Sequence, residues 1–180
     1  MANPPPPPPP GFFQGGAALD LPARRPIHVV LDNVRSAFNV GSIFRTSDAA
    51  GIAHLHLCGW TAWPPHPKIE KTSLGSHEWV PWSRYERTEQ AIADLKARGI
   101  PIVGLETCER AVSLSGFAWP YPVAVVFGHE IVGIMEEIER ACDQLVRIPM
   151  VGHKNSINVA SAFAVVAYDI LRTWQESGRI

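Results

Sequence analysis

The strongest constraint on the fold is an alternation of short apolar runs with helix-like patterns. Residues 122–127, PVAVVF, are apolar without interruption, as expected for a strand that is covered on both faces. Further strand-like runs occupy 27–31, 54–58, 102–105 and 145–148, and helical patterns occupy 40–50, 89–98, 131–141 and 159–174. Strands that alternate with helices predict an α/β domain with a mostly parallel sheet.

Residues 1–25 stand apart from this pattern. Seven consecutive prolines at 4–10 favour a polyproline II conformation and lack amide donors, so they cannot pack as a helix or an inner strand. We therefore predict a disordered tail at 1–25 and one folded domain at 26–180. The length of 180 residues, with 46% hydrophobic and 18% charged residues, suits a single globular domain.

Charge and cysteine content exclude several classes of protein. A net charge of −1 is not that of a protein held on nucleic acid by bulk electrostatics, although the excess of basic residues in the first half permits a local basic face. Three distant cysteines without a Cys-x-x-Cys pair argue against a disulfide framework and a thiolate zinc site. No secretory signal or membrane-spanning run is visible, so we expect a cytoplasmic protein without a membrane partner.

Three loops carry unusual sequence at the strand ends, where ligands bind in parallel sheets. In the first, 32–45, we expect Asn39 to cap a helix and Arg45 to face the same crevice, although an ordinary loop with a solvated arginine remains an alternative. In the second, 127–133, Gly128 allows close approach of a ligand, and Glu130 is expected in the first helical turn. A tight strand-to-helix turn is the plainer interpretation.

The third segment, 148–162, runs into a helix that is apolar around most of its circumference, and a long cap on a core helix is the alternative interpretation. Such a helix is buried in a core or in an oligomer interface. The backbone amides and carbonyl groups of residues 148–160 are well suited to bind an adenosine group. A separate long segment, 60–78, is rich in Pro, Gly, Trp and Lys, and we expect it to be irregular and functional.

Together these loops resemble the three signature motifs of the TrmH/SpoU branch of the SPOUT methyltransferases, over residues 27–174. The first motif matches Asn39, Gly41, Arg45, Thr46 and Asp48. The second, Gly-x-Glu-x-x-Gly, matches Gly128, Glu130 and Gly133. The third matches Ile148, Pro149, Met150, Ser156, Asn158 and Val159, and the segment 71–82 is similar to the connecting region of the family.

The resemblance implies a mostly parallel α/β sheet whose C-terminal segment forms a trefoil knot, in a homodimer. It implies that S-adenosylmethionine is the cofactor and sits in the knot, and it implies no metal. The implied cofactor-binding residues are Leu105, Glu106, Thr107, Phe127, Gly128, Ile148, Met150, Ser156, Ile157, Asn158 and Ala160.

The implied reaction is transfer of a methyl group to a ribose 2′-hydroxyl of tRNA or rRNA. The implied catalytic residues are Arg45, Asn39, Glu130, Ser156 and Asn158. Because the pKa of an arginine lies above ~12, it is a poor proton acceptor. We expect Arg45 instead to pair with the adjacent phosphate and stabilise the developing alkoxide.

We expect the substrate RNA to be held by the domain and its dimer mate. The candidate RNA-binding residues are Arg24, Arg25, Arg35, Lys68, Lys71, Arg84 and Lys154. Trp60, Trp63 and Trp82 could stack on bases, although burial is the alternative for at least one of them.

Other classes of function stay open at this point. One is an RNA-binding protein on the same fold without activity, and another is a methyltransferase directed at a base. An NAD-dependent oxidoreductase lacks its Gly-rich fingerprint here. A metalloenzyme built on His54 and His56 lacks a nearby third ligand.

Overall fold

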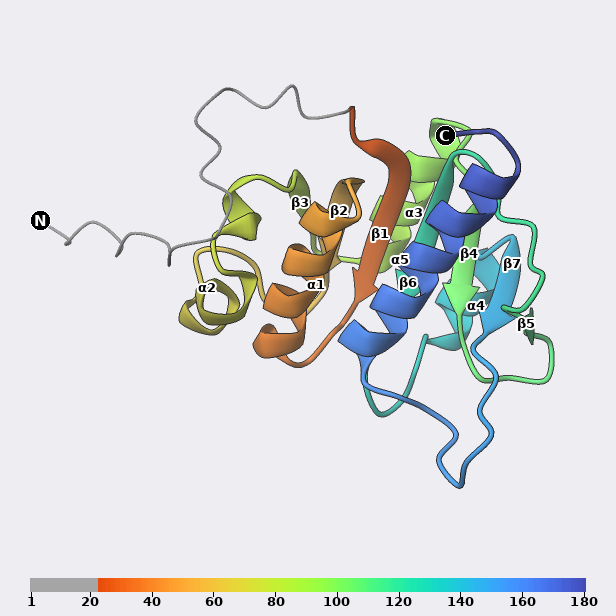
Figure 1. The fold of residues 1–180 in the computed structure, drawn as a ribbon. Coiled ribbons are helices and arrows are strands. Elements are labelled where there is room, and N and C mark those ends of the chain that lie inside the picture. Colours follow the sequence, from red (N-terminus) through yellow and green to blue (C-terminus); the bar gives the residue numbers. More distant parts are fainter. Residues whose placement is uncertain (1–22) are drawn as a thin grey trace, which may run out of the picture.

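The computed structural model describes residues 23–180, in which seven strands form one sheet. All neighbouring strands pair in parallel, in the order β3-β2-β1-β6-β4-β7-β5 (Figure 1). The strands are β1 (Arg25–Asp32), β2 (Ile52–Cys58), β3 (Trp82–Tyr85), β4 (Ile102–Leu105), β5 (Val112–Ser113), β6 (Val123–Phe127) and β7 (Gln144–Arg147). The predicted mostly parallel α/β sheet is therefore confirmed. The predicted proline-rich tail lies almost wholly outside the described residues.

The apolar run at 122–127 forms the central strand. β6 lies between β1 and β4, and all five of its residues are buried. The β-branched valines of this strand suit a pleated backbone, and both faces of the strand meet apolar cores. The continuous apolar pattern therefore follows from the position of β6 in the middle of the sheet.

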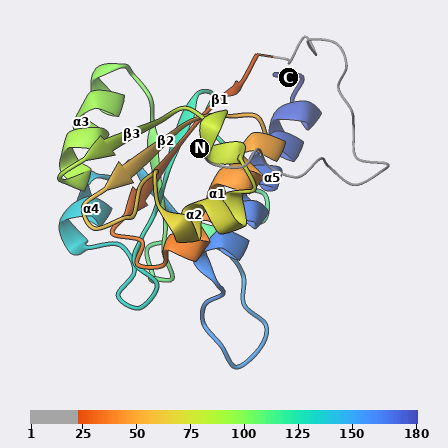
Figure 2. The same cartoon turned by 90° about the vertical axis from the view of Figure 1, so that its left-hand side faces the viewer.

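Helices cover both faces of the sheet. The helices are α1 (Ala37–Ala49), α2 (Pro67–Ser73), α3 (Thr88–Ala97), α4 (Glu136–Ala141) and α5 (Val159–Glu176), with a short 3₁₀ turn, η1 (Ser76–Glu78). α1 and α5 pack side by side on one face, with α2 against α1, and α3 and α4 lie on the other (Figures 1 and 2). Phe44 of α1 and Phe163 of α5 are fully buried in the first layer, and Leu95 of α3 is buried in the second.

One side of α5 faces the core and the other faces solvent. Phe163, Ile170 and Trp174 are buried, whereas Val165 is 42% and Tyr168 is 52% exposed. The helix begins at Val159, and its N-cap is Asn158, whose side chain accepts hydrogen bonds from the amides of the first turn. The predicted burial in a core is therefore confirmed for one face of α5, and the alternative of an oligomer interface stays a prediction for the other face.

Several predicted elements need correction. α1 begins after Ser36, which is the N-cap, so Asn39 lies inside the first turn instead of capping it. The segment 60–78 is not irregular throughout, because His66 caps α2 and Pro67 occupies its first position, both favourable for a helix start. The helix predicted at 131–141 spans only Glu136–Ala141, so Glu130 is not in a helical turn.

The prediction also missed two edge strands, β3 and β5, which are short and do not have a long apolar run. Arg25, assigned to the tail, is the first residue of β1. No helix in the part of the chain from 23 to 180 is long and apolar enough to cross a membrane. All three cysteines are free thiols, and Cys58 is buried.

Candidate active site

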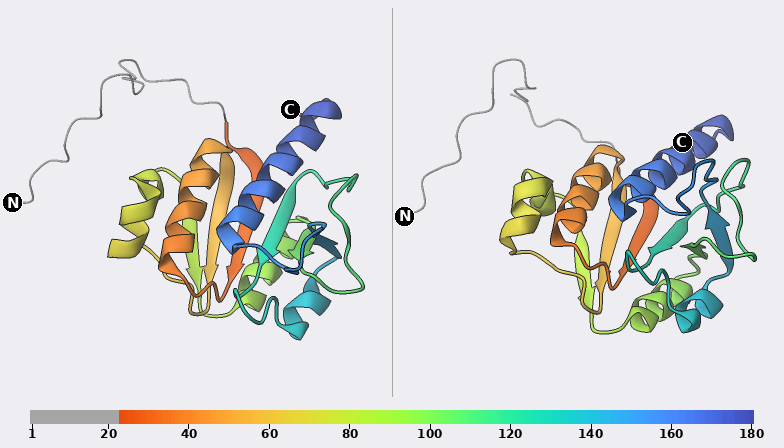
Figure 3. Two further views of the ribbon diagram at one scale, coloured as in Figure 1. Left: turned by 60° about the horizontal axis from the view of Figure 1, so that its bottom comes forward. Right: turned by 90° about the horizontal axis from the view of Figure 1, so that it is seen from below.

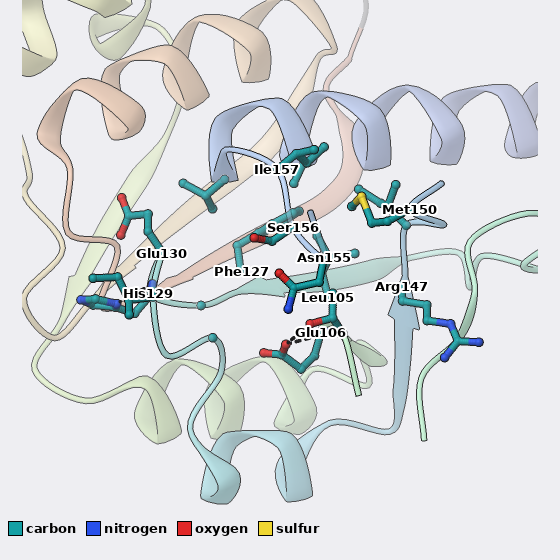
Figure 4. A pocket seen from close by; sticks show the side chains of 17 residues that line it. Leu105, Glu106, Phe127, His129, Glu130, Arg147, Met150, Asn155, Ser156 and Ile157 are labelled. Atoms are coloured by element: carbon teal, nitrogen blue, oxygen red, sulfur yellow. Dashed lines mark hydrogen bonds between the residues drawn. The ribbon is translucent and has the colours of Figure 1, made fainter. Parts of the chain in front are cut away.

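The carboxyl ends of β4, β6 and β7 meet at one edge of the sheet and open into a pocket of about 190 Å³, which we call the cofactor pocket. Figure 3 shows this edge from below, and Figure 4 shows the side chains that line the pocket. Its wall combines backbone from the strand ends with both apolar and polar side chains. The lining residues are Leu105, Glu106, Thr107, Phe127, Gly128, His129, Glu130, Ile131, Gly133, Arg147, Ile148, Met150, Asn155, Ser156, Ile157, Val159 and Ala162.

One wall of the pocket is a tight turn after β6. His129 and Gly133 exchange two backbone hydrogen bonds of 3.0 and 2.9 Å, which close the turn. Gly133 has a φ of +70°, and a Cβ at this position would collide with the carboxylate of Glu106. Glu106 in turn accepts a hydrogen bond from the amide of Ile134 at 2.8 Å. Glycine is therefore required at 133 for both its conformation and the close approach.

Glu130 joins the turn after β6 to the start of α1. Its carboxylate accepts hydrogen bonds from the amides of Arg35 (2.8 Å) and Ser36 (3.0 Å). It also accepts from Nδ2 of Asn39 at 2.9 Å. Partial burial acts to raise the pKa of Glu130, but these donors outweigh it and the pKa is lowered. Glu130 is therefore an ionised acceptor at neutral pH.

Asn158 extends the same chain of hydrogen bonds. Its Nδ2 donates to Oδ1 of Asn39 at 3.0 Å. Its Oδ1 accepts from the amides of Ala160 (2.9 Å) and Ser161 (3.3 Å), which fixes the orientation of the side chain. Glu130, Asn39 and Asn158 thus link all three sequence motifs at the mouth of the pocket, and Ser156 lines the pocket beside them.

Arg45 lies elsewhere. It is exposed on α1 and lines a separate groove with Lys71 of α2 and the hydroxyl groups of Ser42, Thr46 and Thr72. Six residues of helix rotate Arg45 well away from the direction of Asn39, because each residue turns by about 100°. The expectation that Arg45 faces the same crevice as Asn39 is therefore not met within one chain.

The structure brings nine of the eleven expected cofactor-binding residues to the pocket; Asn158 and Ala160 do not line it. The prediction missed several lining residues, namely His129, Ile131, Gly133, Arg147, Asn155, Val159 and Ala162. Gly133 was already visible as the last residue of the second motif. No sequence motif marked Arg147 or Ala162. Arg147 reaches the pocket from the end of β7, and Ala162 reaches it from the start of α5.

The candidate RNA-binding residues are scattered over the surface. The guanidinium of Arg24 donates hydrogen bonds to Asp48 and to the carbonyl oxygens of Ile52 and Trp79, so Arg24 links parts of the fold. Arg84 stacks on the ring of Trp63 at 3.8 Å, and Lys68 lies 5.5 Å from the ring of Phe38.

The remaining candidates differ in their surroundings. Arg35 and Lys154 are exposed near the cofactor pocket, Lys71 shares the groove of Arg45, and Arg25 lies at the start of β1 beside Ala50 and Gly51. Of the three candidate tryptophans, Trp60 is 89% and Trp63 is 38% exposed, whereas Trp82 is partly buried against the core. Burial, the alternative for at least one of them, applies to Trp82.

The histidines considered as metal ligands form a cluster with a third histidine. His28 and His56 lie 3.1 Å apart, Nδ1 to Nε2, and His54 contacts Ser83. Among the described residues, no group of histidine, cysteine and acidic side chains has the arrangement of a metal site.

Comparisons with known proteins agree with this geometry. The sequence model of the SpoU rRNA Methylase family matches residues 26–168. A tRNA (guanosine(18)-2′-O)-methyltransferase of Thermus thermophilus is 33% identical over 159 residues, which are 88% of this chain and 81% of that protein.

Solved structures show the same fold. The TrmH/SpoU tRNA modifying enzyme of A. aeolicus has a TM-score of 0.78 and 29% identity, covering 87% of this chain and 79% of that one. The SpoU methyltransferase AviRb from Streptomyces viridochromogenes in complex with the cofactor AdoMet has a TM-score of 0.78 and 28% identity, covering 86% of this chain and 63% of that one. The chain belongs to the SpoU rRNA methylase family.

Proposed function

We propose that this protein transfers a methyl group from S-adenosylmethionine to a ribose 2′-hydroxyl of tRNA or rRNA. The observation that carries the proposal is the chain of hydrogen bonds from Glu130 through Asn39 to Asn158, placed at the mouth of the cofactor pocket. The names of the relatives support it, since one is a tRNA ribose methyltransferase and another was solved with AdoMet.

The cofactor pocket fits an adenosine group. Leu105, Phe127 and Ile148 provide an apolar slot at the strand ends, and the backbone beside them offers hydrogen-bonding groups. The carboxylate of Glu106 is a candidate acceptor for a ribose hydroxyl. The volume of about 190 Å³ is small, and residues 151–158 are all exposed. We therefore propose that this loop closes over the bound cofactor.

S-adenosylmethionine supplies a methyl group on a sulfonium sulfur that is a good leaving group. The task of the protein is to hold the ribose in line with that methyl group and to stabilise the charge that develops on the 2′-oxygen. We assign Asn39, Glu130, Ser156 and Asn158 to positioning the ribose, because Glu130 fixes Asn39 and Asn158 caps α5.

We assign Arg45 to the RNA phosphate next to the target ribose. Its groove, shared with Lys71 and three hydroxyl groups, offers positive charge and hydrogen-bond donors to a phosphate. Because this groove is away from the cofactor pocket of the same chain, we propose that Arg45 of one protomer serves the pocket of its partner in the dimer. Arg35, Arg84 and Lys154 are the further candidates for RNA contacts.

Three finer features belong to the same proposal. We propose a homodimer, because α5 presents Val165 and Tyr168 on its exposed side. A trefoil knot at the C-terminal part of 26–180 and a cytoplasmic location are expected from the family and from the RNA substrate. No step of the proposed reaction needs a metal ion.

The test is a methyl-transfer assay with labelled S-adenosylmethionine and total RNA that lacks the modification, followed by nuclease digestion and nucleoside mass spectrometry. We expect a 2′-O-methylated nucleoside, and we expect Arg45→Ala to lower transfer by about 100-fold or more while cofactor affinity persists. Arg110→Ala, an exposed arginine outside both sites, is the matched control. Label on a base would indicate a base-directed methyltransferase, and absence of both label and cofactor binding would indicate an RNA-binding protein without activity.

A further inference from the structure

An exposed aromatic side chain stands on α1 beside the residues that position the ribose. Phe38 is 43% exposed, although phenylalanine is usually buried in folded proteins. It directly precedes Asn39, whose side chain donates to Glu130. The proposed reaction gives Phe38 no role. An exposed ring next to a nucleic-acid site is suited to stacking on an unpaired base.

Phe38 is the first residue of a stripe along one side of α1. Ser42 follows it by four residues and Arg45 by seven, which places all three on the same side of the helix. Phe38 and Arg45 are exposed, and Ser42 is half-buried. Because a helix rises by about 1.5 Å per residue, Phe38 and Arg45 are about 10 Å apart along its axis. Neighbouring nucleotides of one RNA strand can span this distance.

α2 packs against α1 and forms the other side of this surface (Figures 1 and 2). Nζ of Lys68 lies 5.5 Å from the centre of the Phe38 ring, as in a cation–π contact. Lys71 lines the groove of Arg45. We call the surface the α1–α2 ridge, and it consists of Phe38, Ser42, Arg45, Lys68, Lys71 and Thr72.

A close contact between the two helices fixes the ridge. Gly41 is buried in α1, and a Cβ at this position would collide with Oγ1 of Thr72 and with the carbonyl oxygen of Ile69. Oγ1 of Thr72 also donates a hydrogen bond to the carbonyl oxygen of Phe38 at 3.0 Å. Glycine weakens a helix interior, so the close approach of α2 explains its presence here. The backbones of the two helices are therefore held in one relative position.

The charge of the ridge suits a polyanion. Within the described part of the chain, its three basic residues form no ion pair. The one acidic residue of α1, Asp48, is paired with Arg24 at 3.2 Å, and α2 has one acidic residue, Glu70. Positive charge beside an exposed ring matches a single RNA strand, because the cations pair with phosphates and the ring stacks on a base.

We propose that Phe38 stacks on a base of the RNA substrate, next to the nucleotide whose ribose is methylated. Lys68 and Lys71 pair with phosphates of the same strand. Gly41 and Thr72 are positioning residues, because they act only by holding α2 against α1. The strand on the ridge leads to the pocket that Arg45 serves, since Arg45 belongs to the ridge. The inference rests on the proposed ribose methylation and adds to it the contact that orients the strand.

The test uses the full chain and total RNA that lacks the modification, in methyl transfer at varied RNA concentration and in filter binding. Phe38→Leu keeps an apolar side chain and removes the ring. We expect it to raise the half-saturating RNA concentration by about 10-fold or more, because stacking on one base is lost. The maximal rate and the affinity for S-adenosylmethionine should stay within about twofold.

Two further variants separate stacking from packing. Phe38→Tyr keeps the ring, so its half-saturating RNA concentration should stay within about threefold of that of the wild type. Tyr121→Leu is the matched control. It removes an aromatic side chain that is 47% exposed just before β6, at the opposite edge of the sheet from the cofactor pocket, and it should leave RNA binding unchanged.

Salt dependence separates stacking from charge. Phe38→Leu should keep the wild-type slope of log affinity for RNA against log salt concentration, because no phosphate contact is lost. Lys68→Met removes a charge and keeps most of the aliphatic stem, and it should lower this slope by about one. A reduced slope in Phe38→Leu would contradict stacking as the role of the ring.

The outcomes distinguish this inference from the proposed function. Equal RNA affinity of Phe38→Leu and the wild type, or equal losses in Phe38→Leu and Phe38→Tyr, would overturn stacking and leave ribose methylation standing. If the wild type formed no methylated ribose, the proposed function would fall. A loss of RNA affinity in Phe38→Leu alone, measured by filter binding, would then still support Phe38 as a stacking residue.

Discussion

The two halves of the sheet are built from different chemistry. In the half formed by β4, β6 and β7, the buried strand residues are apolar, and the cofactor pocket at their ends is lined by apolar side chains together with polar ones such as Glu106, Glu130 and Asn155. In the half formed by β1, β2 and β3, polar groups are buried, including His28, His56 and Asp32. The first half ends in the pocket proposed for the cofactor, and the second buries titratable groups inside the sheet.

The largest expected effect is the loss of stability in acid, which comes from the buried histidines of the half formed by β1, β2 and β3. Burial lowers the pKa of His28 to about 4 and that of His56 to about 3, and Arg98, 3.4 Å from His28, adds to the effect. Because the unfolded chain binds these protons near pH 6.5, the stability is fully present above that pH and is lost as the pH falls toward 4. The loss should be about 1.4 kcal/mol per pH unit for each histidine.

Urea unfolding between pH 7 and pH 4.5 measures this slope. The double variant His28→Phe, His56→Leu should flatten the slope of stability against pH. His153→Leu, in an exposed loop, should leave the slope unchanged. An unchanged slope in the double variant would show that the buried histidines are not the groups that respond to acid.

Glu130 connects the two halves, so its replacement should affect turnover more than cofactor binding. In Glu130→Gln, an amide group would face the three N–H donors that now meet a carboxylate. We expect transfer to fall by about 100-fold, with the Kd for S-adenosylmethionine changed by about threefold or less. Glu136→Gln, on the exposed side of α4, is the control for the loss of one charge. Similar losses of transfer and cofactor affinity would assign Glu130 to the pocket itself.

Gly133 lies in the fixed wall of the cofactor pocket, and Gly152 lies in the exposed loop, so variants at the two positions compare these regions. A Cβ at Gly133 meets the Glu106 carboxylate at a positive φ, whereas a Cβ at Gly152 meets nothing within 4 Å. Gly133→Ala should weaken cofactor binding about tenfold by displacing the turn. Gly152→Ala should bind normally. Calorimetry of the two variants decides whether the wall is as rigid as its hydrogen bonds indicate.

The smallest expected effect concerns the exposed loop, in which residues 151–158 all face solvent. Closure over the cofactor would bury some of its amides. Hydrogen exchange of these amides should slow about tenfold on addition of S-adenosylmethionine, while the amides of the β1–β2–β3 half keep their rates. Protection in β2 and β3 without protection in the loop would contradict the proposed closure.

The sequence predicts the two halves of the sheet to different extents. The fold and the cofactor pocket follow from the apolar run of β6 and from motifs that lie at strand ends, where parallel topology collects them. The buried polar cluster of the other half does not, because His28 of β1 and His56 of β2 become neighbours, 3.1 Å apart, only in the folded sheet.

Local chemistry explains the errors within the elements. Asn39 and Ser36 are both good helix caps, and only the observed contact between Glu130 and Asn39 decides between them. The location of Arg45 also needs the structure, because the pattern gives its spacing from Asn39 but not the neighbouring α2 that forms its groove.

The central claim is that S-adenosylmethionine occupies the pocket at the ends of β4, β6 and β7, and calorimetry tests it directly. Ser156 lines this pocket and is exposed, so Ser156→Trp should fill the pocket without disturbing the core. Lys154→Trp places the same side chain on the same exposed loop outside the pocket. We predict that the wild type and Lys154→Trp bind one S-adenosylmethionine per chain and that Ser156→Trp loses at least about tenfold in affinity. Equal binding by both variants, or no binding by the wild type, would contradict the account.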